Sequence, residues 1–234
     1  MHDMNLKNIN PRAMATLAQL SGRAQAAFGV PSMSPGPGSA GQAGPYNRYR
    51  EMTLEELLLE NRVIFLVGEI NHSSAARVYM QMLYLVNIDA RKDINLYINS
   101  PGGSVTDTLA VYDVMKFIKC DVQTYCIGEC ASGGAVLLMA GTKGKRYILP
   151  NAKVMIHQPY GGVYGQAADI EIQAEEILKT KETLINIMAK CTGQSIDRIK
   201  EDSERDRYFT AEDAMTYGLV DEVLTEEATK SEKK

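Results

Sequence analysis

A single serine hydroxyl stands among small residues in the stretch GECASGGAV, residues 128–136. Ser132 could act as a nucleophile toward a carbonyl group, or it could be the N-cap of a helix whose side chains must be small to pack. The stretch is not a G-x-S-x-G nucleophile elbow, because Cys130 takes the place of the first glycine. Residues 128–136 by themselves therefore leave both interpretations open.

A serine nucleophile needs a base within hydrogen-bond reach. Of the three histidines, His2 lies near the amino terminus, His72 lies in a polar turn before a predicted helix, and His157 ends a predicted buried strand. Functional groups of α/β proteins gather where strands end, and a glycine-rich segment follows His157. His157 is therefore the candidate base, with a purely structural histidine as the alternative.

The base in turn needs a carboxylate that holds it in the right tautomer. Spacing cannot choose this acid, because the chain has 29 aspartates and glutamates. Thr210 and Asp213 resemble a capping pair for a helix that follows them. Asp202, Glu204 and Asp206 lie just upstream and remain as the candidates.

Glycines directly follow two of the predicted strands. Gly102 and Gly103 stand in NSPGGSV, residues 99–105, and two more glycines follow Ser132. Such turns can simply be tight connections from strand to helix, or they can direct backbone N–H groups onto a developing oxyanion. Neither stretch has the lysine and glycine spacing of a phosphate-binding or dinucleotide-binding loop.

Short apolar runs alternate with helical patterns through the middle of the chain. Strands are predicted at residues 62–68, 94–100, 122–128 and 152–157. Helices are predicted at residues 73–89, 105–119, 132–141 and 166–193. This order of strand and then helix predicts a single α/β domain with a mostly parallel sheet covered by helices.

The predicted helix at residues 73–89 is more apolar than a monomer needs. Between Ala75 and Val86 the only strongly polar residues are Arg77 and Gln81, which share one narrow stripe. A helix that is apolar nearly all round is covered nearly all round. Either the core surrounds this helix, or another subunit packs against it.

The composition argues against several kinds of partner and site. A net charge of −4 and a pI near 5.5 predict no basic surface for nucleic acid or anionic membranes, and the apolar runs are too short to span a bilayer. No C-x-x-C pair and no histidine at ligand spacing accompanies the cysteines, so we expect no metal site. Reduced, buried thiols are expected at positions 120, 126, 130 and 191.

The two ends of the chain differ from its middle. Residues 1–48 include a stretch dense in Pro, Gly, Ser and Ala, which predicts a flexible extension that is either a removable pro-segment or a targeting peptide. Residues 226–234 predict a charged, disordered tail. The folded domain is therefore expected at residues 49–225.

Several long motifs occur in an order that resembles one known family. They are LYINSPGGSV, CIGECASGGA, GTKGKRYILPNAKVMIHQP, GQAADIEI and ERDRYFTAEDAMTYGLVDEV, within Tyr46 to Leu224. Over this span the chain resembles ClpP, the proteolytic subunit of the ATP-dependent Clp protease. The resemblance implies a ClpP/crotonase-like single domain of stacked βα units, with a protruding strand-helix handle whose long helix follows Gln166.

The resemblance also assigns roles to residues. It implies that Ser132 is the nucleophile, His157 its base and Asp206 the orienting acid, and that Ser132 both caps its helix and attacks. The implied oxyanion donors are the backbone N–H groups of Gly103 and Gly133. The implied substrate-binding residues, which would pair with an extended peptide, are Gly102, Ser104, Val105, Gly161 and Gly162.

Two positions depart from the family pattern. Gly133 stands where many members carry methionine, and Asn95 stands where an aromatic residue commonly lines the pocket that receives unfoldase loops. Both the placing of the oxyanion donor and the docking specificity therefore remain open. The residues that still fit the docking pocket are Leu83, Tyr84, Tyr97 and Phe117.

The function implied by the resemblance is a serine endopeptidase that cuts unfolded polypeptides into short peptides. The implied assembly is two stacked seven-membered rings, with an AAA+ unfoldase of the ClpX, ClpA or ClpC type as partner. That unfoldase would use the ATP, so no cofactor is expected here. The expected location is the bacterial cytoplasm, or an organelle matrix if the extension is a targeting peptide. The alternatives are a non-catalytic ring subunit and a crotonase-like acyl-CoA enzyme.

Overall fold

A seven-stranded sheet forms the centre of the domain. The computed structural model describes residues 52–159, 162 and 164–225, so the predicted extension and tail lie outside the described residues. The strands run in the order β1-β2-β3-β4-β7, and β5 pairs with both β3 and β6. Their bounds are β1 (Val63–Val67), β2 (Ile94–Ser100), β3 (Val122–Ala131), β4 (Arg146–Ile148), β5 (Lys153–Ile156), β6 (Arg207–Phe209) and β7 (Glu222–Val223).

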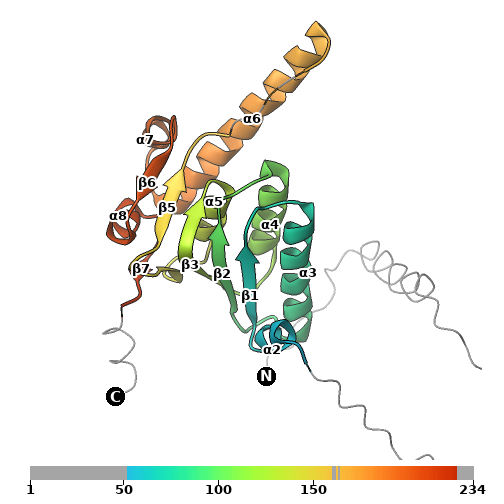
Figure 1. Cartoon of the computed structure of the whole chain (residues 1–234), viewed down its shortest axis with the longest axis vertical. Coiled ribbons are helices and arrows are strands. Elements are labelled where there is room, and N and C mark those ends of the chain that lie inside the picture. The colour runs from blue at the N-terminus through green and yellow to red at the C-terminus, as the bar shows by residue number, and fades with distance from the viewer. Residues whose placement is uncertain (1–51, 160–161, 163, 226–234) are drawn as a thin grey trace, which may run out of the picture. The chain divides into compact units, whose positions relative to one another are not determined.

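Helices connect the strands, and every strand pair is parallel except β5 with β6. Figure 1 shows α3 and α4 side by side along the sheet, where they join β1 to β2 and β2 to β3. The α/β prediction is thus confirmed. The helices of the described residues are α2 (Leu54–Glu60), α3 (His72–Ile88), α4 (Val105–Phe117), α5 (Gly133–Met139), α6 (Ala167–Thr192), α7 (Ile196–Asp202) and α8 (Ala211–Tyr217).

The predicted long elements form within a few residues of their expected bounds. The largest difference is in β3, which continues to Ala131 and so ends directly before Ser132. The predicted cap is confirmed, because the Thr210 side chain accepts a hydrogen bond from the Asp213 backbone at the start of α8. The short elements β4, β6, β7, α2 and α7 were not predicted.

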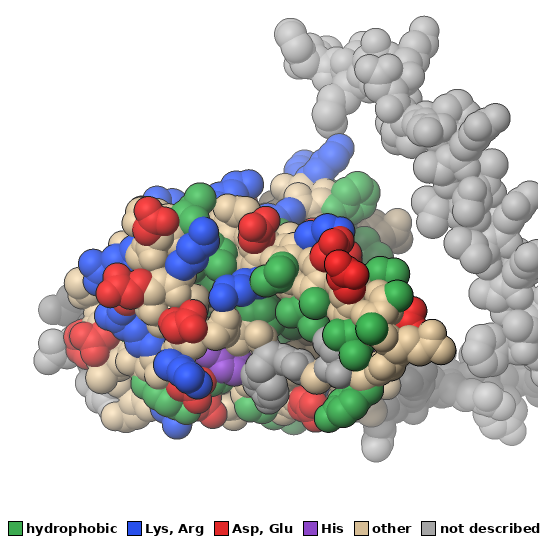
Figure 2. Space-filling model, turned by 90° about the horizontal axis from the view of Figure 1, so that it is seen from above, with side chains coloured by type: hydrophobic (Ala, Val, Ile, Leu, Met, Phe, Trp, Pro, Cys, Tyr) green, Lys and Arg blue, Asp and Glu red, His purple; other side chains and the backbone are tan. Residues whose placement is uncertain are grey.

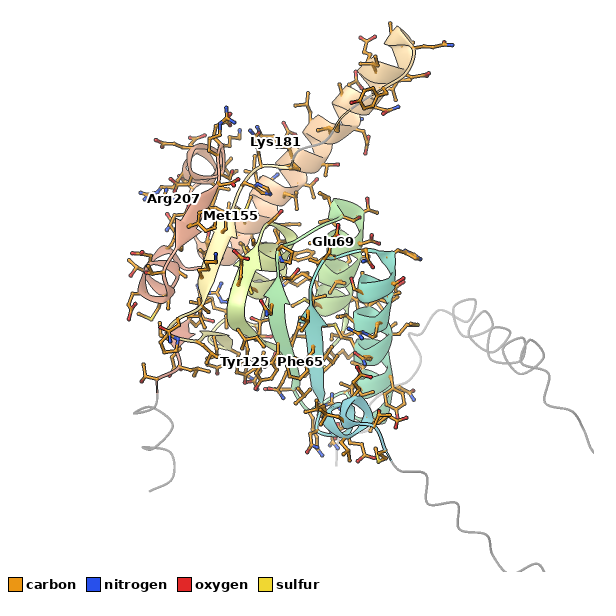
Figure 3. All side chains as sticks on the ribbon, in the orientation of Figure 1. Phe65, Glu69, Tyr125, Met155, Lys181 and Arg207 are labelled. Atoms are coloured by element: carbon orange, nitrogen blue, oxygen red, sulfur yellow. The ribbon has the colours of Figure 1, made fainter. Side chains whose placement is uncertain are left out.

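The two faces of the sheet differ because side chains alternate along a strand. Buried residues of β2 such as Leu96 and Ile98 join the core under the helices. On the other face Phe65, Tyr97, Tyr125 and Tyr147 stack in sequence, with ring centroids 5.2, 4.4 and 4.9 Å apart. Partial burial in this stack raises the pKa of Tyr125 to about 12. Figure 3 marks two of its members, Phe65 and Tyr125.

The core of this chain covers only one side of α3. Its buried residues are Ala75, Val78, Met82 and Leu85. Large apolar side chains on its other side are exposed, namely Met80, Leu83, Tyr84 and Ile88. Of the two alternatives, the one in which the core surrounds this helix is therefore wrong, and coverage by another subunit remains a prediction.

The first half of α6 projects from the domain (Figure 1), and each of residues 166–179 is exposed. Buried residues appear only in the second half, at Leu184, Ile185 and Met188. Figure 2 looks along the direction of this projection, and hydrophobic side chains gather on one side of that view. The projecting segment itself carries the exposed apolar residues Ile170, Ile172, Ile177 and Leu178. The helical part of the predicted handle is thus present.

Candidate active site

Strand register brings Ser132, His157 and Asp206 together. In the parallel pair of β3 and β5, Ala131 lies beside Met155, and the Ser132 N–H donates to the Met155 carbonyl at 2.9 Å. In the antiparallel pair of β5 and β6, Ile156 faces Arg207. One further step of that register places His157 opposite Asp206. Figure 3 marks Met155 and Arg207 on the two neighbouring strands.

The imidazole of His157 contacts both other side chains. Its Nε2 lies 2.8 Å from Ser132 Oγ, and its Nδ1 lies 3.0 Å from Asp206 Oδ1. Both distances are within hydrogen-bond range. The His157 side chain is mostly buried, with 14% exposed, whereas 58% of the Asp206 side chain is exposed in the single chain. This arrangement can take a proton from the serine hydroxyl and stabilise the resulting imidazolium.

The backbone at Ser132 is strained. Its φ of 52° and ψ of −119° are rare for a residue other than glycine. Ser132 occupies the N-cap position of α5, but its side chain makes no capping hydrogen bond. The expectation that it both caps and attacks is therefore wrong in its first part. The sharp turn from β3 into α5 instead directs the hydroxyl to His157.

Glycines let the loop after β2 approach this serine. A Cβ atom at Gly102 would lie 2.7 Å from Ser132 Cβ, and one at Gly103 would lie 2.2 Å from the Ile70 carbonyl oxygen. Both glycines also have positive φ angles, of 93° and 151°. Gly133 supplies the first N–H of α5, a position with no acceptor inside the helix. Gly103 and Gly133 both line the pocket that contains Ser132.

This pocket has mainly apolar walls beside Ser132 and His157. Of the predicted substrate-binding residues, Val105 lines the pocket. The Ser104 hydroxyl instead accepts a hydrogen bond from the backbone N–H of Asp107 and so caps α4. Gly162 is not among the lining residues, and Gly161 lies outside the described residues. The pocket is lined by Gly103, Val105, Thr108, Ser132, Gly133, Val136, Ile156, His157, Pro159, Leu184 and Met188.

Sequence reasoning missed several of these lining residues. Leu184 and Met188 come from α6, four residues apart on its buried side, and helical periodicity was the signal that could have placed them together. Thr108 sits one turn into α4 and is buried. No pattern in the sequence placed Thr108 at this pocket.

Three hydrogen bonds from two neighbouring segments hold Gln158, the residue after His157. The Gln158 N–H donates to the Ser203 carbonyl at 2.6 Å, and its side-chain amide donates to the Glu204 carbonyl at 3.1 Å. From α6, the Lys181 ammonium donates to the Gln158 side-chain oxygen at 2.6 Å. These contacts fix the chain beyond β5, so they restrict the position of the imidazole.

Asp202, another candidate acid, anchors β6. Its side chain is nearly buried and accepts hydrogen bonds from the Tyr217 hydroxyl at 2.7 Å and Arg198 Nε at 3.1 Å. It also forms an ion pair with Arg207, the residue that follows Asp206. The carboxylate of Asp202 therefore ties α7 and α8 to β6, the strand that begins directly after Asp206.

Replacing Asp202 with asparagine is expected to lower kcat roughly tenfold to a hundredfold while KM changes little, because small displacements of reacting groups are costly. The measurement is peptide hydrolysis per active site, with sites counted by covalent labelling of Ser132. Glu201→Gln on the exposed side of α7 is the control. An unchanged kcat per labelled site would mean that Asp202 only stabilises the fold.

The four docking residues lie on two surfaces of the single chain. Leu83 and Tyr84 are exposed on α3, and Phe117 is exposed at the end of α4. Tyr97 belongs to the aromatic stack on the opposite face of the sheet. The substituted position, Asn95, accepts a hydrogen bond from the Tyr125 hydroxyl at 3.3 Å. One chain therefore does not assemble these four residues into one pocket.

The described residues contain neither a membrane span nor a cluster of metal ligands. No helix in that part of the chain is long and apolar enough to cross a membrane. Those residues also include no group of three or more His, Cys, Asp or Glu side chains placed to hold a metal ion. All four cysteines are free thiols, three of them buried.

Comparison with known proteins supplies the context of this site. Residues 47–227 match the Clp protease family. The chain is 54% identical over 179 residues to ATP-dependent Clp protease proteolytic subunit 1 of Rhodopirellula baltica, covering 76% of this chain and 79% of that protein. It is 53% identical over 176 residues to proteolytic subunit 2 of Chlamydia trachomatis serovar D, covering 75% and 87%. With so much of its length matched, this protein belongs to the Clp protease family.

Proposed function

We propose that this chain is a serine endopeptidase subunit in which Ser132, His157 and Asp206 form the catalytic triad. The observation that carries the proposal is the unbroken contact from Asp206 through His157 to Ser132, at 3.0 and 2.8 Å. The proteolytic subunits of ATP-dependent Clp proteases to which the chain is similar support the same reaction class. The chain is thus a protease subunit of the Clp system, with hydrolysis of peptide bonds as its chemistry.

The geometry supports a two-step reaction. Ser132 Oγ attacks the peptide carbonyl while His157 Nε2 accepts its proton, and the same nitrogen then returns the proton to the leaving amine. Asp206 accepts a hydrogen bond from the Nδ1–H group and stabilises the imidazolium. The N–H groups of Gly103 and Gly133 bind the oxyanion, because both residues border the pocket at Ser132. Water then releases the acyl group by the reverse sequence.

The substrate in this proposal is an extended, unfolded polypeptide. It lies between residues 102–105 and residues 158–165, pairing main chain to main chain, which requires no particular side chain. This mode suits the cleavage of many different sequences into short peptides. The mainly apolar pocket next to Ser132 receives the side chain on the amino-terminal side of the cut bond.

We also propose that the chain works in stacked rings that receive substrate from an AAA+ unfoldase. Three features support the assembly: the uncovered apolar side of α3, the projecting half of α6, and a docking set split between two surfaces of one chain. A neighbouring subunit can join such split surfaces. In this proposal the unfoldase consumes the ATP, the protease domain comprises residues 49–225, and the complex resides in the bacterial cytoplasm.

Labelling with a fluorophosphonate tests the proposed nucleophile. The reagent is expected to add to Ser132 alone, as shown by mass spectrometry of the digested protein, and to block peptide hydrolysis in proportion. A crotonase-like enzyme or a non-catalytic ring subunit would cleave no peptide, so the reagent would have no hydrolysis to block. Mass photometry of the same sample tests assembly, and a stable monomer would contradict the proposed ring.

A further inference from the structure

Position 133 is a glycine because the structure leaves no space there for a side chain. The Gly133 backbone is not among those with a positive φ, so its conformation alone would accept a side chain. A Cβ atom built there would lie 2.4 Å from Thr108 Oγ1 and 3.3 Å from Ile70 Cδ1. The second contact can relax, because Ile70 Cδ1 is the end of a flexible side chain. The first contact is too short to keep.

Thr108 cannot easily move away from this contact. Its side chain is buried, with 1% exposed, and its hydroxyl donates to the Ser104 carbonyl one turn earlier at 2.8 Å. A β-branched side chain inside a helix also has few allowed rotamers. Thr108 therefore occupies the space that a side chain at position 133 would need.

Both residues border the pocket that contains Ser132 and His157. The N–H of Gly133 is one of the two proposed oxyanion donors, so a displacement at this position affects the reaction itself. The contact between Thr108 and Gly133 consequently affects both the wall of the pocket and the position of the Gly133 N–H.

We infer that Thr108 is a specificity-determining residue, which replaces a side chain at position 133 as the rigid wall of the substrate pocket. This inference rests on the proposed function. The substrate feature it controls is the size of the apolar side chain on the amino-terminal side of the cut bond. Thr108 and Gly133 form a coupled pair: position 133 accepts a side chain only when the Thr108 oxygen is absent.

A double-mutant cycle tests the coupling. The proteins are wild type, Thr108→Ala, Gly133→Ala and the double variant, compared by kcat/KM on peptides that differ only in having Ala, Leu or Phe before the cut bond. Gly133→Ala is expected to lower kcat/KM roughly tenfold to a hundredfold on all three, because overpacking displaces the backbone at the donor. Adding Thr108→Ala is expected to restore kcat/KM to within about threefold of wild type, since Thr108 Cβ would then lie 3.4 Å from the new atom.

Thr108→Ala alone is expected to favour larger side chains. The ratio of kcat/KM for Phe to that for Leu should rise roughly threefold to tenfold, because the wall recedes by one hydroxyl and one methyl group. Thr106→Ala, at an exposed position of the same helix, should leave this ratio unchanged. An unchanged ratio in Thr108→Ala would overturn the assignment of specificity.

Thr108→Ser is the matched variant for the cycle, because it keeps the oxygen that causes the conflict. Gly133→Ala combined with Thr108→Ser should stay as impaired as Gly133→Ala alone. Equal recovery with Ser and Ala at position 108 would overturn the coupling. Melting temperatures of the same proteins give a second reading if Gly133→Ala folds poorly, with recovery again expected from Thr108→Ala only. Wild-type protein that resists fluorophosphonate labelling would instead refute the proposed function.

Discussion

Replacing Ser132 with alanine is expected to lower the turnover number for peptide hydrolysis about 10⁶-fold. The residual rate would come from the oxyanion donors and substrate binding, which act without the nucleophile. Folding should be retained, because the Ser132 hydroxyl makes no helix-capping bond that alanine would lose. The measurement is initial rates on a fluorogenic peptide, at enzyme concentrations high enough to detect six orders of magnitude.

The matched control for this variant is Ser73→Ala, which removes an exposed serine hydroxyl from the start of α3. Its turnover should equal that of wild type. Intact mass of wild type and Ser132→Ala adds a second readout, because removal of a pro-segment within residues 1–48 by self-cleavage would stop in the variant. Substantial peptide cleavage by Ser132→Ala would exclude this serine as the nucleophile.

Replacing Asp206 with asparagine is expected to lower kcat about 10⁴-fold. The amide can donate a hydrogen bond to His157 Nδ1, which then favours the tautomer that carries its proton on Nε2. That nitrogen lies 2.8 Å from Ser132 Oγ and could no longer accept the serine proton. The loss should therefore persist at saturating substrate concentrations, because the walls of the substrate pocket are unchanged.

Comparison with two other aspartates makes this prediction specific. Asp197→Asn, at an exposed position on α7, should leave kcat unchanged. Asp202→Asn should fall between the two, because Asp202 acts on β6 through Arg207 and not on the imidazole. An effect of Asp202→Asn larger than that of Asp206→Asn would reverse their assigned roles.

Hydrophobic pattern and turn residues predicted the long elements of this fold. The run at residues 94–100 forms β2 with those bounds, and the helical pattern at residues 105–119 forms α4 from Val105 to Phe117. Such segments carry enough periodic residues to specify their own type. The strands β4, β6 and β7 have only two or three residues each, so their conformation depends on the neighbours with which they pair.

The candidate site was predicted less evenly. Residue types and strand ends indicated Ser132 and His157, whereas three neighbouring carboxylates remained open until the resemblance to ClpP assigned Asp206. The structure supplies a physical reason for choosing Asp206, because the antiparallel register of β5 with β6 places residue 206 opposite residue 157. Two helices, α6 and α7, separate β5 from β6 along the chain, so no tight turn fixes the register of this pair locally.

The sequence by itself determined the alternation of strands and helices, the glycines beside Ser132, and the family. Tertiary structure decided which carboxylate faces His157, why Ser132 leaves its helix uncapped, and why a buried threonine from α4 excludes any side chain at position 133. The physical reason is that residue types set the conformation of their own segment, whereas the distances between segments follow from tertiary packing. Positions 108 and 133 are 25 residues apart along the chain, and Thr108 takes the space of a side chain at position 133 only after α4 and α5 have packed together.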